Sequence, residues 1–405
     1  MLIVPLENAR PGMKLAVTVT HPDHPEQELL KVGYDLREDV IDRMRKLGVE
    51  AVYVEYPDLA DLDKHMAGYL SPARQEIYCH VRDTITSIQK SAKPTVSFAD
   101  YYAATRELVA TLMRQGQNAV YLDHMSGKLG ANAVEHATAV SHLSLMLGLR
   151  LEPYLIQQRS RLEPRHAREV INLGVAGMLH DIGLACLPEE VRRFSRVSPP
   201  EDPATFAEWQ THAQRGYDLI KGGVEPTAAA AVLHHHRHFD GTGFAEVPEK
   251  KGDPQKNAGQ RIHVFPRILT VADLYDRLTV GEGGRRRQNI EILHLMRTKY
   301  SAWIDPEIMR VVPSVIPPFP PGMTVTLSDG GRAVTVGIRP DNPYRPMIKR
   351  IVDPAEFKLA EEVVDLTLER GLEIEEVGGV PAGPLIPAPP GGGAKKPQPA
   401  KSAAA

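Results

Sequence analysis

Histidine and aspartate residues that could bind metal ions are the first chemical signal in this sequence. The chain has 16 histidines, and four of them lie between His234 and His238. His180 and Asp181 directly follow Val170–Leu179, whose apolar residues recur at helical spacing. An imidazole nitrogen and a carboxylate therefore lie together at a predicted helix end. A carboxylate has two oxygens and can bridge two cations, so this pair is a candidate metal-binding motif.

His136 is a second candidate ligand, because it lies on an apolar stripe. Val140, Leu143 and Leu147 follow it at spacings of 4, 7 and 11 residues. This spacing places all four side chains on one helix face, which points toward the core rather than toward water. For His136 alone, a buried, hydrogen-bonded core histidine is the simpler interpretation.

Further candidates share this inward placement. His212 shares a helix face with Trp209, and His234–His236 end an Ala-rich segment. Asp273 lies in the apolar stretch Ile268–Leu278, where an unpaired carboxylate would be costly to bury. If each of these residues were an ordinary core residue, its burial would need a separate explanation. One shared metal centre accounts for all of them together.

Such a centre would suit the hydrolysis of phosphoesters. Nitrogen and carboxylate ligands suit borderline divalent metals such as iron, manganese, zinc and cobalt. Two metals bridged by a carboxylate deprotonate a water at neutral pH and neutralise the charge that develops on the phosphorus oxygens. Cys79 and Cys186, the only cysteines, form no CxxC motif. A structural zinc finger and a disulfide framework are therefore disfavoured.

Length and composition limit the number of domains and the class of protein. Its 405 residues predict two or three domains, and 42% hydrophobic with 24% charged residues is ordinary for a globular protein. The net charge of −3 gives no case for binding a nucleic-acid polymer. We find no uninterrupted apolar run of the length that spans a bilayer and no secretory signal. A cytoplasmic protein without a membrane segment is therefore expected.

The hydrophobic pattern predicts a mainly α-helical protein made of five successive parts. In the first part, Leu15–Val19 and Val49–Val54 are expected as strands, and Leu36–Leu47 as a helix that ends at Gly48. Near the C-terminus, apolar residues alternate on both sides of Ser328–Gly331, which predicts a β-hairpin. The parts are a small α+β module at 1–57, a helical connector at 58–118, a helical metal-binding domain at 119–312, a β-hairpin and helix extension at 313–377, and a disordered tail rich in Pro, Ala and Gly at 378–405.

The order of the candidate ligands resembles the HD-GYP domain, a branch of the HD metal-dependent phosphohydrolases that hydrolyses the bacterial second messenger cyclic di-GMP. The resemblance covers roughly residues 120–312 and includes the motif Met178–Gly183 and the loop Asp240–Gly243. Residues 1–57 are similar to the small domain that often precedes HD-GYP domains, and the hairpin at 323–338 is similar to a β-segment that often follows them. Seven ligand-type positions match in order: His136, His180, Asp181, His212, His235, His236 and Asp273.

The resemblance implies an all-helical HD-type domain that holds two divalent metal ions. Iron or manganese is expected first, with zinc, cobalt or nickel as alternatives. The first metal would be held by His136, His180, Asp181 and Asp273, and the second by Asp181, His212, His235 and His236. Asp181 and His180 are the implied catalytic residues, and Gly243, Phe244 and Arg285 the implied substrate-binding residues. His238 is expected as a solvated or substrate-side residue.

The sequence departs from the family pattern at several positions. Leu184 replaces a lysine near the phosphate, Arg237 replaces a glutamate, and Phe244-Ala245 replaces the Tyr-Pro of the Gly-Tyr-Pro motif. Asn132 replaces an acidic residue that supports a third metal in some members, so two metals are favoured, although Glu189 could contribute weakly. The lost lysine is expected to weaken transition-state stabilisation by about 10²-fold, so Leu184→Lys should raise the rate.

The segments after these motifs carry mixed charge. Glu282 takes the place of a basic residue that grips phosphate, while Arg285–Arg287 form either a phosphate-binding patch or a solvated helix start. The polar loop Glu246–Gln260 is longer than usual and is expected as a surface insertion.

Three functions compete for this pattern. The first is a phosphodiesterase that hydrolyses cyclic di-GMP with a metal-activated hydroxide at a slow rate. The second is a degenerate relative that binds metal and the cyclic dinucleotide as a signalling or interaction module without significant turnover. The third is an HD hydrolase of another nucleotide, against which the loop Asp240–Gly243 argues. Protein signalling partners or a homodimer are compatible with the first two.

Overall fold

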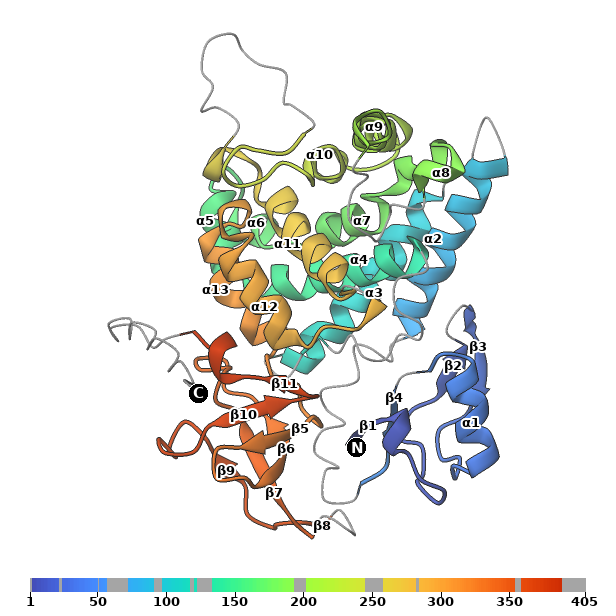
Figure 1. Ribbon diagram of the computed structural model, residues 1–405. Helices are drawn as coiled ribbons and strands as arrows, with labels where there is room; N and C mark the ends of the chain where they lie inside the picture. The colour runs from blue at the N-terminus through green and yellow to red at the C-terminus, as the bar shows by residue number, and fades with distance from the viewer. Residues whose placement is uncertain are drawn as a thin grey trace, which may run out of the picture.

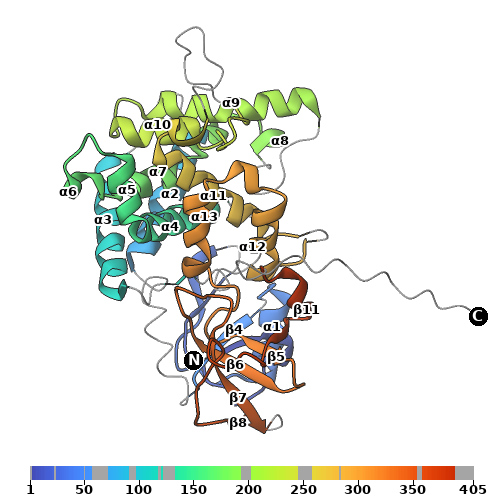
Figure 2. The same ribbon diagram turned by 90° about the vertical axis from the view of Figure 1, so that its left-hand side faces the viewer.

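A helical domain lies at one end of the molecule, and two β-containing parts lie at the other (Figure 1). The turned view in Figure 2 shows the same arrangement, with α9 and α10 farthest from the β-strands. This computed structural model describes residues 2–21, 24–49, 51–56, 72–90, 97–116, 120–121, 133–192, 202–244, 258–281, 284–353 and 358–387.

The helical domain contains the expected apolar helices and several shorter ones. Its helices are α2 (Pro72–Lys90), α3 (Phe98–Gln115), α4 (Ala133–Arg150), α5 (Glu152–Gln158), α6 (Pro164–Ala167), α7 (Ile171–Leu179), α8 (Glu189–Arg192), α9 (Pro203–Ile220), α10 (Pro226–His234), α11 (Val264–Leu278), α12 (Asn289–Thr298) and α13 (Pro306–Val315). A 3-10 helix, η5 (Ile182–Cys186), links α7 to α8.

Helices α4 and α7 form the centre of this domain, because both are buried over most of their length and on all sides. The residues of α4 from Val134 to Gly148 are buried, as are those of α7 from Leu173 to Leu179. Their backbones nearly touch at Gly177, where an added Cβ would lie 2.6 Å from the Cα of Ser141. The Ser141 hydroxyl also donates a hydrogen bond to the Gly174 carbonyl at 2.9 Å. This close packing fixes the first half of α4 relative to the C-terminal end of α7.

Helices α2 and α3 lie in the segment predicted as a connector, and they are part of the same core. Ile77 and Val81 of α2 and Leu108 of α3 are fully buried in one cluster with α4, α7 and α11. The cause is local, since apolar residues recur at helical spacing in both helices. The described residues of this segment therefore complete the helical domain as well as linking it to the N-terminal module.

The N-terminal module is α+β, as the sequence predicts. Helix α1 (Glu38–Lys46) is followed by Gly48, which has a φ of +83°. Strand β4 (Ala51–Val54) pairs antiparallel with β1 (Leu2–Pro5). The strand expected at Leu15–Val19 begins only at Val19: β2 (Val19–His21) pairs with β3 (His24–Leu30), whereas Leu15 makes a single bridge to Val54.

The C-terminal part is an antiparallel sheet in the order β11-β10-β5-β6-β7-β8, with β9 also paired to β7. The predicted hairpin is present, because β5 and β6 pair around the turn after Leu327. Val334 and Leu359 of this sheet are buried in one cluster with the core of the N-terminal module, so the two parts pack together. The strands are β5 (Thr324–Leu327), β6 (Arg332–Gly337), β7 (Met347–Asp353), β8 (Lys358–Leu359), β9 (Val364–Asp365), β10 (Ile374–Val377) and β11 (Val380–Pro381).

Two expectations for the C-terminal part are wrong. The helix predicted within 313–377 is absent from the described residues after Val315, because residues 358–377 pair as β8, β9 and β10 and bury Leu366 and Ile374 against the sheet. The tail predicted to be disordered from residue 378 begins with an ordered segment, in which β11 pairs with β10 and Ala382 is fully buried. Residues 388–405 lie outside the described residues.

One segment among the described residues, Pro164–Cys186, is long and apolar enough to cross a membrane, judged by its length and composition alone. It folds as α6, α7 and η5 in the middle of the helical domain, and 78% of the apolar window is buried inside the fold. This burial is typical of a core segment in a globular domain.

The core also contains a histidine whose burial makes the stability of the fold depend on pH. His142 of α4 is 2% exposed, and neither of its ring nitrogens has a hydrogen-bond partner among the described residues. Burial lowers the pKa of His142 to about 3. The unfolded chain, with an ordinary histidine pKa of about 6.5, therefore takes up a proton first as the pH falls. The stability that depends on neutral His142 is present above about pH 6.5 and is lost progressively toward pH 3.

We expect His142→Leu to remove this acid sensitivity. Between pH 7.5 and pH 5, the free energy of unfolding of the wild type should fall by about 2 kcal/mol more than that of the variant, from the pKa difference at His142. Urea unfolding at the two pH values measures this difference. The exposed His166 of α6, changed to leucine, is the matched control and should follow the wild type. Parallel pH dependence in wild type and His142→Leu would show that His142 is not the group responsible.

Candidate metal centre

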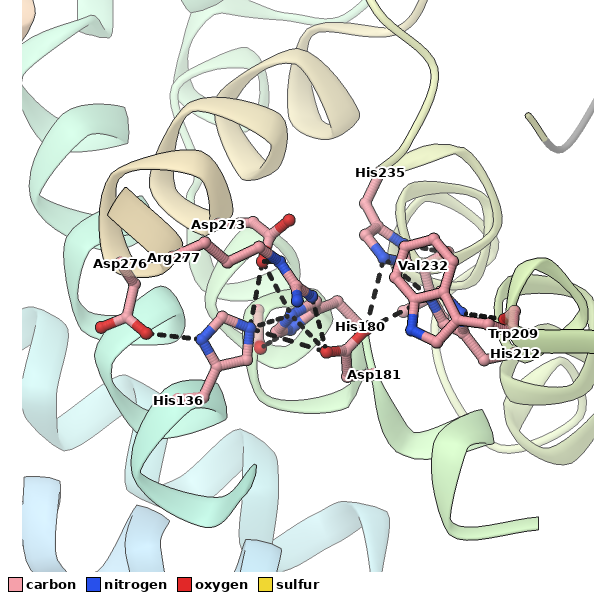
Figure 3. Close-up of polar contacts among 11 residues, drawn as sticks. His136, His180, Asp181, Trp209, His212, Val232, His235, Asp273, Asp276 and Arg277 are labelled. Atoms are coloured by element: carbon pink, nitrogen blue, oxygen red, sulfur yellow. Dashed lines mark hydrogen bonds and ion pairs between the residues drawn. The ribbon is translucent and has the colours of Figure 1, made fainter. Parts of the chain in front are cut away.

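The predicted ligands converge on one buried site, to which five helices contribute either their own residues or the turn that follows them (Figure 3). His136 comes from α4, His212 from α9 and Asp273 from α11. His180 and Asp181 follow the last residue of α7, and His235 and His236 follow α10. All seven side chains are buried, the most exposed being His236 at 9%.

The first group of atoms surrounds one oxygen of Asp181. Its Oδ2 lies 3.6 Å from Nε2 of His136 and 3.6 Å from Nε2 of His180. Asp273 joins the same group, because its Oδ1 is 3.0 Å from His136 Nε2 and 3.8 Å from His180 Nε2. These four atoms have the chemistry of a site for one divalent cation, with two nitrogen and two oxygen donors.

The second group surrounds the other oxygen of the same carboxylate. Asp181 Oδ1 lies 3.2 Å from Nε2 of His212 and 3.6 Å from Nε2 of His235. His236 completes a set in which one ligand atom from each of four residues lies within 4.8 Å of the others. Asp181 therefore lies between two clusters of nitrogen ligands and offers one oxygen to each, as Figure 3 shows for most of these residues.

Hydrogen bonds to the backbone fix which nitrogen of each histidine faces the centre. The Nδ1 of His180 donates to the carbonyl of Gly177 at 2.8 Å, that of His212 to Trp209 at 2.6 Å, and that of His235 to Val232 at 2.7 Å. A carbonyl can only accept, so each Nδ1 carries the proton and each Nε2 presents a bare lone pair. Such partners orient metal-binding histidines and raise their basicity.

The same reasoning applies to His136, whose partner is a carboxylate. His136 Nδ1 donates to Asp276 Oδ2 at 2.6 Å, so its Nε2 also points into the centre without needing a proton. Asp276, which is 1% exposed, thus acts on the site through His136.

Unpaired buried atoms show that the second group fits a cation. Asp181 Oδ1 and His236 Nε2 are buried and have no hydrogen-bond partner among the described residues. The His212 Nε2 near Asp181 Oδ1 has no proton to donate, because its proton is on Nδ1, and it also lies 3.3 Å from the equally bare Nε2 of His235. Buried acceptors that face one another in this way are costly unless a cation lies between them. The donor set therefore fits a divalent metal ion.

Four of the ligands have the protonation states that a metal site needs, whereas at His136 the carboxylates of Asp273 and Asp276 outweigh burial and raise the pKa. Burial would raise the pKa of Asp181, but the neighbouring His180 imidazole and the Arg277 guanidinium outweigh it and hold that pKa well below its usual range. The same balance, with Arg277 and His136 as the opposing groups, keeps the pKa of Asp273 low. Burial lowers the pKa of His235 to about 4 and that of His236 well below the ordinary value. The carboxylates are thus ionised and these two histidines neutral at pH 7.

Arg277 is a member of the site that the sequence analysis does not identify. Its Nε donates to Asp273 Oδ1 at 2.6 Å, and its Nη2 donates to Asp181 Oδ2 at 3.0 Å. The side chain is 11% exposed. The only signal in the sequence is its position four residues after Asp273 on the same helix, which is also the spacing of ordinary surface ion pairs.

The predicted substrate-binding residues occupy different surroundings. Gly243 has a φ of +91°, and a Cβ there would lie 1.9 Å from the His236 carbonyl oxygen, so this loop needs glycine. The Phe244 ring then stacks on His236 with a centroid distance of 4.6 Å. Arg285 is 55% exposed and donates to Glu291 at the start of α12, so its described contacts are those of a helix-start ion pair.

Other residues singled out in the sequence lie around the site or outside the described residues. His238 stacks on Trp303 at 3.9 Å between ring centroids and contacts the Thr242 hydroxyl through Nδ1. Arg237 makes a backbone bridge to Gly243. Glu189 is exposed on α8 and belongs to neither ligand cluster. Asn132, Ala245, Glu282 and loop residues 246–257 lie outside the described residues.

Leu184 does not present its side chain to solvent at the centre. It is 4% exposed and packs in a small apolar cluster with Leu187, Val191 and Trp209, against which Phe206 and Phe244 also pack. The expectation that Leu184→Lys places a positive charge near the phosphate does not agree with this packing. The turn of η5 directs the side chain into the cluster instead.

We therefore expect Leu184→Lys to destabilise the protein. Burying an unpaired ammonium among these apolar side chains should lower the free energy of unfolding by more than about 2 kcal/mol. Leu184→Met keeps volume and polarity and should cost less than about 1.5 kcal/mol. Urea unfolding of both variants tests this. A lysine variant as stable as the methionine variant, with faster phosphoester hydrolysis, would restore the prediction made from the sequence.

The family model that matches this chain covers most of the residues of the site. Residues 139–308 match the HD_5 family model, described as an HD domain. The chain is 25% identical over 235 residues to the cyclic di-GMP phosphodiesterase PA4108 of Pseudomonas aeruginosa, an alignment that covers 57% of this chain and 51% of that protein. The chain thus spans about half the length of this curated relative. Among solved structures, Bd1817, an HDG"Y"P protein from Bdellovibrio bacteriovorus, matches with a TM-score of 0.40 and 14% identity, over 76% of this chain and 97% of that one.

A helical domain that gathers histidines and aspartates from α4, α7, α9, α10 and α11 around one buried carboxylate is the architecture of an HD domain. Within that class, the ligand order and the Asp240–Gly243 loop resemble those of the HD-GYP branch. The comparisons therefore identify residues 139–308 as similar to an HD domain.

Proposed function

We propose that this protein is a metal-dependent phosphodiesterase that hydrolyses cyclic di-GMP. The observation that supports it most is the position of Asp181, whose two oxygens face two separate groups of bare histidine nitrogens. The substrate is inferred from the relative in Pseudomonas aeruginosa together with the HD-GYP order of residues. Iron or manganese is the proposed metal on the basis of the family resemblance, and nitrogen and carboxylate donors without thiolates are compatible with either.

The protein residues in this proposal mainly hold and orient the reacting groups. A divalent metal at this centre supplies a Lewis acid that polarises a phosphoryl oxygen and makes a water molecule nucleophilic. Asp181 fixes the position of the site between the two groups, while Asp276 and the backbone carbonyls before the histidines keep the Nε2 lone pairs turned inward. Because these groups are held before substrate binds, little reorganisation is needed during the reaction.

Aromatic residues cover the second group of ligands. Trp209 is 1% exposed and lies 4.9 Å from His212 and 5.1 Å from His236, between ring centroids. Phe244 packs on the same side of His236. These rings exclude water from that side of the centre, which strengthens the electrostatic interactions inside. We propose that Gly243 and Phe244 also line the position of the substrate.

Hydrolysis by protein purified without oxygen tests the proposal. The protein is loaded with Mn²⁺ or Fe²⁺ and incubated with cyclic di-GMP, and the products are separated by chromatography. We expect metal-dependent conversion to the linear dinucleotide or GMP, and no comparable conversion of a nucleoside triphosphate. Faster hydrolysis of the triphosphate would instead favour an HD hydrolase of another nucleotide.

A second candidate function is supported by Arg277 and Leu184. The guanidinium of Arg277 contacts carboxylate oxygens that a metal would use, and no lysine stands at position 184. A protein that binds the cyclic dinucleotide as a signalling or interaction module, without significant turnover, would be compatible with both features. Saturable binding of cyclic di-GMP by the metal-loaded protein, with no product after prolonged incubation, would favour this module.

A further inference from the structure

The two groups of ligands around Asp181 differ in whether a cation already neutralises them. In the first group, the oxygens that face the histidines, Asp273 Oδ1 and Asp181 Oδ2, both accept hydrogen bonds from Arg277. In the second group, Asp181 Oδ1 and His236 Nε2 have no hydrogen-bond donor among the described residues. The protein therefore supplies its own cation to one group and leaves the other to an external one.

From this asymmetry we propose that the Arg277 guanidinium takes the place of the first metal ion, so that the centre binds a single divalent metal at Asp181, His212, His235 and His236. The inference rests on the metal-binding part of the proposed function and not on the identity of the substrate. It differs from the two-metal arrangement that the family resemblance implies.

Competition for the same atoms is the first argument. A divalent metal in the first group would have to lie about 2.0–2.2 Å from its oxygen ligands. Arg277 Nε and Nη2 already lie 2.6 and 3.0 Å from Asp273 Oδ1 and Asp181 Oδ2. A metal bound to both oxygens would thus be in contact with a guanidinium that cannot lose its charge. The two cations exclude each other from this group.

The position of Arg277 is the second argument, because its side chain is not a mobile surface group. It is 11% exposed, and it lies four residues after Asp273 on α11, where the helix directs both side chains to the same face. In Figure 3 the Arg277 side chain lies between Asp273 and Asp181 and beside His136. If the Arg277 side chain left this position, a buried carboxylate would lose its charged partner, which would destabilise the protein.

Charge balance is the third argument. Three buried carboxylates belong to the centre, namely Asp181, Asp273 and Asp276, which are 7%, 5% and 1% exposed. Arg277 and one divalent metal together neutralise these three negative charges. Two divalent metals in addition to Arg277 would leave the buried centre with excess positive charge, which the protein interior disfavours.

The test counts metal ions in the full chain. Protein purified without oxygen is saturated with Mn²⁺, freed of excess metal by gel filtration, and analysed by elemental analysis and electron paramagnetic resonance. We expect one Mn²⁺ per chain and the spectrum of an isolated ion in the wild type. Arg277→Met and Arg277→Gln remove the charge and should each bind two ions, with the spectrum of a magnetically coupled pair.

Matched controls separate the charge of Arg277 from a general effect of the substitution. Arg310→Met removes an exposed arginine of α13, whose contact is with Glu307, and should still bind one ion. Circular dichroism and thermal melting establish whether the Arg277 variants are folded. If neither variant folds, the wild-type ion count and spectrum alone decide between one metal and two.

Each outcome has a defined meaning. Two coupled ions in the wild type would overturn the inference and leave the proposed function intact. One ion in both the wild type and the folded Arg277 variants would also overturn it, because Arg277 would then not be what excludes the second metal. A wild type that binds no Mn²⁺, Fe²⁺ or Zn²⁺ would overturn the inference and the proposed function together.

Discussion

Replacing Asp181 by alanine is expected to abolish metal binding and hydrolysis together. Asp181 is the only described residue whose two oxygens face both groups of histidine nitrogens, and its ionised carboxylate is the negative charge nearest to the second group. Without it, His212, His235 and His236 would have to hold a divalent cation with neutral ligands alone. We expect the rate of cyclic di-GMP hydrolysis to fall by at least about 10²–10³-fold, the effect typical of losing one preorganised electrostatic group.

Elemental analysis and product chromatography on the same protein sample test this expectation. Asp218→Ala is a matched control, because Asp218 is an exposed aspartate of α9 that contacts Lys221 at 2.7 Å and lies away from the ligands. It should keep the wild-type metal content and rate. Full metal content with full activity in Asp181→Ala would refute the role of Asp181 as a metal ligand, while metal loss without any change in rate would show that hydrolysis does not depend on this centre.

Replacing Gly183 by alanine is expected to separate α9 from the metal centre. A Cβ at Gly183 would lie 2.0 Å from the His212 carbonyl oxygen and 2.6 Å from the Gly216 nitrogen. Both atoms are backbone atoms of α9, so the helix itself would have to move. We expect the free energy of unfolding to fall by about 3 kcal/mol, which is at the upper end of the range for overpacking. Metal binding should also become weaker, because His212 would be displaced.

Urea unfolding and Mn²⁺ titration measure the two effects. The control is Gly222→Ala, at a glycine near the end of α9 where an added Cβ would meet nothing within 4 Å and the backbone has no positive φ. It should be close to wild type in both measurements. A Gly183→Ala protein with unchanged stability and metal affinity would mean that α9 and η5 have more room to move apart than their backbone contact indicates.

The burial of His136 and Asp273 could be predicted from the sequence for a physical reason, whereas the full set of seven ligands follows from the family resemblance and stays a prediction. A buried helix face is recognisable from apolar residues at helical spacing, so His136 and Asp273 could be placed in the core from their neighbours alone. The structure brings these residues together with His180, Asp181 and the histidines after α10. Local spacing determines which face of a helix is buried, and it did so correctly for α4 and α11.

Features that depend on contacts between distant segments could not be predicted in this way. Arg277 is four residues from Asp273, but its contact with Asp181 joins positions 96 residues apart and exists only because α11 packs beside the end of α7. The orientation of Leu184 depends on Trp209 and Phe244, which are brought to it by α9 and by the Gly243 turn. The strands in residues 358–377 depend on pairing with β5 and β7, and a single segment does not reveal its partner.

The two helices that end at the metal centre couple the cation to the secondary structure around it. His180 is the residue that caps the C-terminus of α7, and His235 caps that of α10. The partial negative charge at a helix C-terminus is stabilised by a nearby cation, and the effect is confined to the last turn. A metal bound here would thus act as a shared C-terminal cap for α7 and α10. Hydrogen exchange in the last turns of these helices would then report metal occupancy, independently of whether any substrate is turned over.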